Sequence, residues 1–308
     1  MATQGYVSPQ KPELFAFYPL WPMILSILDS LLGQYAQWIG VFLNIAFFSG
    51  AVVLLRRWVL RISPKLVLPF LLLLVFDRFS FWSHTLYSES VFFLLMAGLL
   101  SSTELKTNWK AQLLGGISTA NRAVGGALIG GIGLANIAFY LKKPHKGIFA
   151  LLLGASGLIL FFVFNEIATG NAFANISAQS HWSRSLSFEN FLNSLFHSIR
   201  VFIFPTSVYI WLVIYFVAKP PKSLKLRSED RWMCLLLLAI PLFAGPIALP
   251  RFVSIIPLAY LAVAFLFSCI KNRKFQFTLF ALWLLGELFW QWKLTQKFYL
   301  GHNFPWIG

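Results

Sequence analysis

The chain has 308 residues, of which 58% are hydrophobic and only 11% are charged, and its formal net charge is +15. A soluble domain carries about 25% charged residues, so this composition excludes an ordinary soluble protein and indicates a multi-pass membrane protein. The positive charge does not predict nucleic-acid binding, because the basic residues form no stripe on a soluble surface. They lie in short connectors between apolar segments, which is typical of cytoplasmic loops: Arg56–Lys65, Lys106–Lys110, Lys142–Lys146, Lys219–Arg231 and Lys271–Lys274.

The first part of the chain, residues 1–37, is predicted to be an outer-face segment. Leu20–Leu32 is apolar but contains Pro22 and Asp29, which favours an interfacial helix over a span. The first predicted span, Trp38–Leu55, runs inward because a basic pair follows it. The sequence contains no signal peptide or earlier hydrophobic segment that would carry this segment outside. We expect either unaided insertion or, as we favour, a first span that this sequence lacks.

Residues 38–164 and 201–292 are predicted to hold the spans, because each apolar segment approaches the length that a bilayer requires. The cytoplasmic connectors set the direction of each span. The predicted spans are Trp38–Leu55, Leu66–Phe76, Glu89–Leu100, Ile148–Phe164, Val201–Ala218, Trp232–Leu249, Val253–Ile270 and Phe275–Trp292.

A short stretch between two cytoplasmic loops, at about 111–141, cannot hold two full spans and is too long for one. We predict a pair of short or re-entrant helices whose apex carries Asn121 and Arg122. Irregular backbone at that depth requires burial within protein. The glycines at 115, 116, 125, 126, 130, 131 and 133 would allow close helix approach.

An outer loop, residues 165–200, is predicted to contain an amphipathic helix over Leu186–Ile199, which either caps the bundle or admits a lipid substrate. The loop also contains a glycosylation sequon at Asn175. Residues 293–308 would be an outer tail. Residues 1–308 thus form a single integral membrane domain, all α-helical and polytopic, with interfacial helices on its outer face.

The strongest candidate for chemistry is Arg122, because a guanidinium at bilayer depth should face the protein interior and hold an anion. Arg251 follows a helix break, and together the two could clamp a phosphate. The structural alternatives are an internal salt bridge from Arg122, for instance to Glu89, and an interface anchor for Arg251. Glu89 is the best buried candidate for a general base, although it could simply begin a helix. Asp77 and Arg78 are interpreted as a local ion pair.

Several segments, in this order, resemble the PIG-V-like mannosyltransferases, the family that includes the enzyme adding the second mannose to GPI anchors and its prokaryotic relatives. The resemblance spans nearly the whole chain. The matching segments are Gly5-Tyr6, Phe17–Pro22, Tyr87–Phe93, Ser118–Gly125, Asn165–Asn171 with Gln179 and Trp182, and Pro250–Phe252 with Pro257.

This resemblance implies a GT-C-like helical bundle and an inverting transferase that uses a polyprenyl-phosphate sugar, without a cofactor or a metal. Members place a catalytic aspartate just before the Gly-Tyr segment, but only Met1–Gln4 precede Gly5 here, and none is acidic. We therefore expect an N-terminally truncated and inactive form unless another carboxylate, Glu89, serves as the base. The candidate substrate-binding residues are Arg122, Arg251, Asn121, Tyr18, Tyr87, Gln179 and Trp182, and Trp21 is a further aromatic candidate for stacking on sugar or prenyl faces.

The leading functional hypothesis is transfer of mannose, or a related hexose, from a polyprenyl-phosphate donor to a lipid or glycan acceptor on the non-cytoplasmic side. The protein would lie among membrane lipids, in the plasma membrane of a prokaryote or the ER membrane of a eukaryote. One alternative is a secondary transporter or lipid flippase, since buried arginine and broken helices also mark substrate pathways. Another is a non-catalytic membrane scaffold. Under the leading hypothesis, Arg122→Ala should abolish transfer and leave the protein folded.

Overall fold

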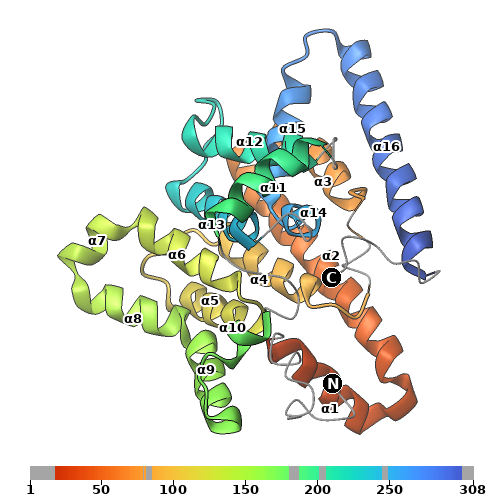
Figure 1. The fold of residues 1–308 in the computed structure, drawn as a ribbon. Helices are drawn as coiled ribbons and strands as arrows, with labels where there is room; N and C mark the ends of the chain where they lie inside the picture. The colour runs from red at the N-terminus through yellow and green to blue at the C-terminus, as the bar shows by residue number, and fades with distance from the viewer. Residues whose placement is uncertain are drawn as a thin grey trace. The chain divides into compact units, whose positions relative to one another are not determined.

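The computed structural model describes residues 18–78, 80, 85–179, 187–200, 206–244 and 249–299, and the regular elements in this part are helices (Figure 1). Contacts within the chain divide it into two compact units. The first unit comprises Met1–Ala51 and Ser83–Ser185, and the second comprises Val52–Trp82 and Leu186–Gly308. Helix α2 (Ala36–Ile62) contributes to both units along its length.

The first unit is organised around α5, which packs against α4, α6, α8 and α9. Gly33, with φ of 51°, ends α1 in a backbone conformation that favours glycine and leads into the short turn before α2. Besides the first part of α2, the helices of this unit are α1 (Leu20–Leu32), α4 (Glu89–Ser101), α5 (Trp109–Asn121), α6 (Gly125–Ala135), α7 (Ile137–Lys142), α8 (Pro144–Gly154), α9 (Ser156–Thr169) and α10 (Ala174–Gln179).

Glycine allows α5 to approach α8 and α9 closely. A Cβ added to Gly116 would lie 2.5 Å from the carbonyl oxygen of Leu153, and one added to Gly157 would lie 2.5 Å from the backbone nitrogen of Ala120. Backbone atoms cannot move aside as a flexible side chain can, so these positions require glycine. The expectation that the glycines of this region allow close approach is wrong for Gly126 and Gly133, because nothing lies within 4 Å of a Cβ built there.

The second unit has α15 at its core, and α15 packs against α12 and α3. All side chains from Leu258 to Ala264 on α15 are buried. Helix α11, at the predicted amphipathic segment, packs against α13, where Phe191 stacks on Phe243 at 4.8 Å. Besides the second part of α2, the helices are α3 (Val67–Val75), α11 (Phe188–Arg200), α12 (Thr206–Ala218), α13 (Ser228–Ala244), α14 (Leu249–Val253), α15 (Pro257–Ser268) and α16 (Arg273–Tyr299).

Few described helices are both long and apolar enough to cross a bilayer. The helical run Leu20–Ile62 is long and apolar enough, and α8 with α9, bent by 55°, would be a second span if the pair counts as one. The apolar helices α4 and α12 have 13 residues each. At 1.5 Å per residue they are about 20 Å long, short of the roughly 30 Å hydrocarbon core. The larger set of spans therefore stays a prediction.

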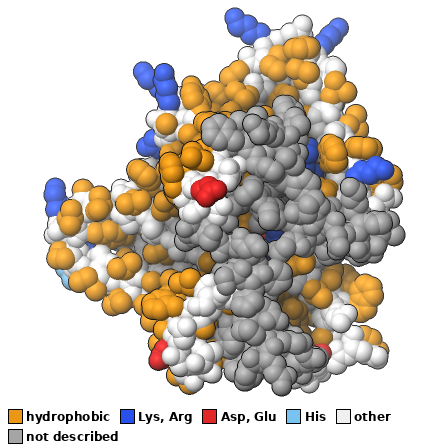
Figure 2. Space-filling model, viewed as in Figure 1, with side chains coloured by type: hydrophobic (Ala, Val, Ile, Leu, Met, Phe, Trp, Pro, Cys, Tyr) orange, Lys and Arg blue, Asp and Glu red, His pale blue; other side chains and the backbone are white. Residues whose placement is uncertain are grey.

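The helices nevertheless present large apolar side chains to their surroundings. Figure 2 shows hydrophobic side chains over much of the described surface on one face, with Lys and Arg side chains in a few separate groups. Among the most exposed are Leu31, Leu141 and Ile167, each more than 70% exposed. Apolar surface this extensive is typical of helices that contact lipid or a partner rather than water.

Candidate functional site

Glu89 and Arg122 form an ion pair inside the first unit. Glu89 is the first residue of α4, and its Oε1 lies 2.6 Å from Nη1 of Arg122. The two side chains are 2% and 12% exposed. The sequence analysis gave a salt bridge between Arg122 and Glu89 as the structural alternative to anion binding by Arg122, and this salt bridge is present in the structure. Two opposite charges so close and so little solvated hold each other in place.

Arg122 reaches Glu89 because the chain breaks between α5 and α6. Its backbone is extended, with φ of −156° and ψ of 148°, and its N–H donates to the carbonyl of Ser118 at 3.1 Å. The N–H of Gly125 then donates to the Arg122 carbonyl at 2.9 Å, which closes a turn into α6. Since α4 packs on α5, this turn brings the guanidinium to the start of α4.

Asn121 lies beside the ion pair and contacts the backbone. Its Nδ2 donates to the carbonyl of Ser88 at 3.0 Å, and the side chain is buried. Its Oδ1 is also buried and has no hydrogen-bond partner among the described residues. A buried acceptor without a partner is rare in native proteins.

The predicted aromatic residues occupy different environments. Tyr18 is buried, lies 4.6 Å from the ring of Phe161 and accepts a hydrogen bond from Nδ2 of Asn175 at 3.5 Å. Burial raises the pKa of Tyr18 to about 12, so the phenol stays protonated at neutral pH. Trp21 is only 3% exposed and belongs to a core cluster, and its role in stacking on a substrate stays a prediction. The burial of Asn175 likewise disfavours glycosylation at the sequon.

The remaining candidates of the first unit are Tyr87, Gln179 and Trp182. Tyr87 is half-buried, and its carbonyl accepts a hydrogen bond from Nδ2 of Asn44 at 2.9 Å. Gln179 ends α10, but its side chain is not described, and Trp182 lies outside the described residues. Asn44 was missed by the sequence analysis. The available signal was a single asparagine in the apolar run of α2, where its side chain is fully buried.

Arg251 belongs to the second unit, on the short helix α14. It is half-buried, and its carbonyl accepts a hydrogen bond from the hydroxyl of Ser254 at 2.7 Å. Tyr260 donates to the carbonyl of the same Ser254 at 2.8 Å, which ties α14 to the start of α15. That Arg251 joins Arg122 in one phosphate clamp stays a prediction.

A second buried ion pair, between Arg78 and Glu287, lies in the second unit. Nε and the backbone N–H of Arg78 donate to Oε2 of Glu287 at 2.8 Å and 3.2 Å, and Nη2 donates to Oε1 at 3.3 Å. The sequence predicted a local pair with Asp77, whereas this partner lies 209 residues along the chain. Nearby, Gln291 of α16 donates to the hydroxyl of Ser80 at 2.8 Å. These contacts fasten α16 to the segment after α3.

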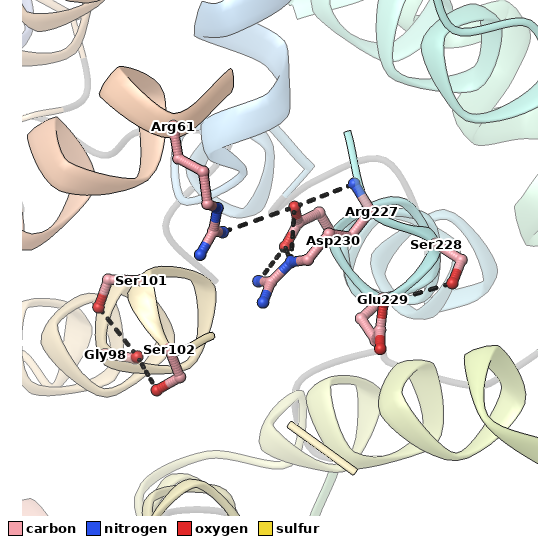
Figure 3. Close-up of polar contacts among 8 residues, drawn as sticks. All are labelled: Arg61, Gly98, Ser101, Ser102, Arg227, Ser228, Glu229 and Asp230. Atoms are coloured by element: carbon pink, nitrogen blue, oxygen red, sulfur yellow. Dashed lines mark hydrogen bonds and ion pairs between the residues drawn. The ribbon is translucent and has the colours of Figure 1, made fainter. Parts of the chain in front are cut away.

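Asp230 forms a third charged cluster, in the second unit (Figure 3). Its side chain is fully buried and lies 2.6 Å from Nη2 of Arg227 and 3.9 Å from Nη2 of Arg61. From its place in the basic connector Lys219–Arg231, the sequence favours a solvated loop charge for Asp230, and its full burial shows that this interpretation is wrong. An acidic residue in the first turn of a helix, three residues after an arginine, was the available signal.

Figure 3 also includes a polar contact that belongs to the first unit. The hydroxyls of Ser101 and Ser102 donate to the carbonyl of Gly98 at 3.0 Å and 2.8 Å and satisfy the end of α4. Among the described residues, no group of three or more His, Cys, Asp or Glu side chains is arranged to hold a metal ion.

No protein-family model matches the sequence, and no curated protein sequence matches it. Among solved structures, the fold is similar to that of ArnT from Cupriavidus metallidurans bound to undecaprenyl phosphate, with a TM-score of 0.55 and 14% sequence identity. The similarity covers 87% of this chain and 53% of the ArnT chain, so this chain spans about half the length of that protein. The predicted all-α architecture is confirmed for the described residues, and the helical fold of the chain resembles that of ArnT.

Proposed function

We propose that this protein is a GT-C-type glycosyltransferase of the membrane that moves a hexose from a polyprenyl-phosphate donor to a lipid or glycan acceptor on the non-cytoplasmic side. The observation that carries the proposal is the similarity of fold to ArnT, whose structure holds undecaprenyl phosphate. Undecaprenyl phosphate is a polyprenyl phosphate, the class of carrier that the sequence resemblance implies. Fold and sequence pattern therefore support the same class of donor.

The charged pair of the first unit supplies the groups that an inverting displacement needs. In this proposal, an oxygen of the acceptor attacks the anomeric carbon of the sugar, and its proton passes to the carboxylate of Glu89. The bond from that carbon to the phosphate oxygen breaks, and polyprenyl phosphate leaves with the electron pair. A base and a stabilised leaving group are sufficient for this step.

The contact between Arg122 and Glu89 is compatible with a role for Arg122 at the phosphate. A guanidinium has five N–H donors in a planar fork, so one edge can contact a carboxylate while another contacts a phosphate. The buried Oδ1 of Asn121 is a nearby acceptor for a sugar or acceptor hydroxyl. Mannose is our first choice of sugar, on the resemblance to PIG-V-like enzymes.

The proposal is tested with purified protein in lipid nanodiscs and radiolabelled polyprenyl-phosphate mannose, alongside the glucose and galactose donors. A lipid and glycan extract from cells without the gene provides the acceptors. We expect label to move into the acceptor fraction with wild-type protein, and Glu89→Gln and Arg122→Ala each to reduce the rate by about 100-fold or more. Glu229→Gln, a change in the second unit, is the control and should keep the wild-type rate.

Binding is measured separately by native mass spectrometry with undecaprenyl phosphate and with undecaprenol, which lacks the phosphate. We expect selective binding of the phosphate form and its loss in Arg122→Ala. Equal binding of both lipids, or no transfer from any of the three donors, would contradict the proposed function. Movement of the intact donor across the bilayer without transfer would identify a flippase.

A further inference from the structure

Four successive backbone carbonyls immediately before α4 are each held by a side-chain donor from another helix. These donors come from three helices of the first unit, α1, α2 and α5. Nδ2 of Asn44 donates to the carbonyls of Thr85 and Tyr87, the latter at 2.9 Å; Nε1 of Trp21 donates to that of Leu86 at 2.7 Å; and Nδ2 of Asn121 donates to that of Ser88 at 3.0 Å.

The three donors lie deep in the protein, at 0%, 3% and 2% exposure for Asn44, Trp21 and Asn121. A buried amide or indole N–H is costly unless it has a partner, and so is a buried carbonyl. Inside a helix, backbone N–H groups of the next turn donate to each carbonyl. In segment Thr85–Ser88, side-chain N–H groups donate to the carbonyls instead. The segment is thus fixed by contacts far apart in the sequence, at separations of 33 to 65 residues.

This segment leads directly into the proposed site. Glu89 follows it, and the carbonyl of Ser88 also accepts the N–H of Phe92 at 3.1 Å, the first hydrogen bond of α4. Because the side-chain direction of a first helical residue depends on the backbone just before it, fixing the segment fixes the carboxylate. Asn121 adjoins Arg122, so the far partner of the ion pair is tied to the same segment.

We propose that Asn44 and Trp21 are positioning residues for the Glu89–Arg122 site. They act through the backbone of Thr85–Ser88, which they hold so that the carboxylate stays aligned with the reacting hydroxyl. Neither residue needs to touch the substrate. The positioning role rests on the proposed function, because the reaction that these residues would assist is the sugar transfer. The hydrogen bonds by which they hold the backbone do not depend on that function.

The first test removes one hydrogen bond and keeps an aromatic ring. Trp21→Phe deletes the indole N–H, and amide hydrogen exchange by mass spectrometry follows the peptide that contains residues 86–92. We expect about fivefold faster exchange there, the consequence of losing one buried hydrogen bond. Trp58→Phe is the matched control, because Trp58 is also fully buried while its Nε1 has no hydrogen-bond partner among the described residues.

The second test measures donor turnover in the transfer assay. Asn44→Leu replaces the amide by an apolar side chain of similar size, and Asn44→Asp replaces its donor with an acceptor. We expect both changes, like Trp21→Phe, to lower kcat about tenfold and to alter KM for the donor less than about twofold. Asn136→Leu is the control, because Asn136 donates to a carbonyl of its own helix, away from the segment.

The outcomes separate the two claims. Unchanged exchange in Trp21→Phe and Asn44→Leu would overturn the inference whatever the activity. Faster exchange with unchanged kcat, or an equal loss of kcat in Trp58→Phe and Asn136→Leu, would overturn the positioning role. A wild-type protein that transfers no sugar would refute the proposed function and this role together, while the exchange data would still decide whether the side chains hold the segment.

Discussion

Removal of Arg122 alone should destabilise the protein more than removal of the whole Glu89–Arg122 pair. In Arg122→Ala, a carboxylate that is 2% exposed loses the guanidinium 2.6 Å away. Two unit charges about 4 Å apart attract each other by about 4 kcal/mol at an effective dielectric constant of 20. Breaking a buried pair by removing one partner costs about 3–5 kcal/mol, whereas replacing both partners is often nearly neutral.

We therefore expect Arg122→Ala to lower the free energy of unfolding by about 3 kcal/mol and the double variant Glu89→Gln/Arg122→Ala to restore about 2 kcal/mol of it. The measurement is a double-mutant cycle, with unfolding of all four proteins followed in the same detergent. A coupling energy under about 0.5 kcal/mol would refute the view that the pair is buried and mutually dependent. We expect Arg122→Ala to remain folded, as the sequence predicts, but with lower stability than the wild-type protein.

Three further predictions concern packing, charge and modification. Gly157→Ala should destabilise the first unit, because the added Cβ would lie 2.5 Å from the backbone nitrogen of Ala120. Gly126→Ala, where nothing lies within 4 Å of the added Cβ, should be neutral or stabilise the protein by up to about 1 kcal/mol. Equal melting temperatures of the two variants would argue against the close approach of α5 and α9. Asp230→Asn should lower the free energy of unfolding by about 2–3 kcal/mol, since two guanidinium groups lose a fully buried carboxylate; in chemical unfolding, a change below about 0.5 kcal/mol would contradict this account. Asn175 should stay unmodified in protein made in a secretory pathway, because it is only 5% exposed; full glycan occupancy by mass spectrometry would contradict its burial.

Structural features that depend on a few neighbouring residues could be predicted from the sequence. The all-helical architecture follows from apolar segments separated by basic connectors. The turn after Asn121 could be located because a charged residue interrupts a glycine-rich apolar run, and in the structure α5 ends there and α6 begins at Gly125. Helix α1 occupies Leu20–Leu32, the apolar run that follows Pro19 and ends before Gly33. In each case, a few neighbouring residues carry the information.

Pairings between distant segments could not be predicted in the same way. Arg78 has an acidic neighbour in Asp77, and proximity in sequence favoured that pair, but Glu287 lies within hydrogen-bond distance because α16 folds back on the segment after α3. Asp230 lies in a basic connector that looks solvated, yet the second unit buries it completely. The spacing of Arg227 and Asp230 indicates their local pairing, but burial depends on which distant segments pack over a residue.

Polar side chains within the apolar helices donate hydrogen bonds to the irregular backbone that leads into the proposed site. Each helix break exposes carbonyl and N–H groups that the helix no longer satisfies, and in an apolar environment these groups require partners from within the protein. Asn44 and Trp21 do not form a polar face on their own helices; their donors reach the carbonyls of Thr85–Ser88, in front of a different helix. A lone amide in an apolar run thus indicates an irregular backbone elsewhere in the fold. Because that irregular backbone carries Glu89 to Arg122, the residues that stabilise the break also determine the geometry of the proposed site.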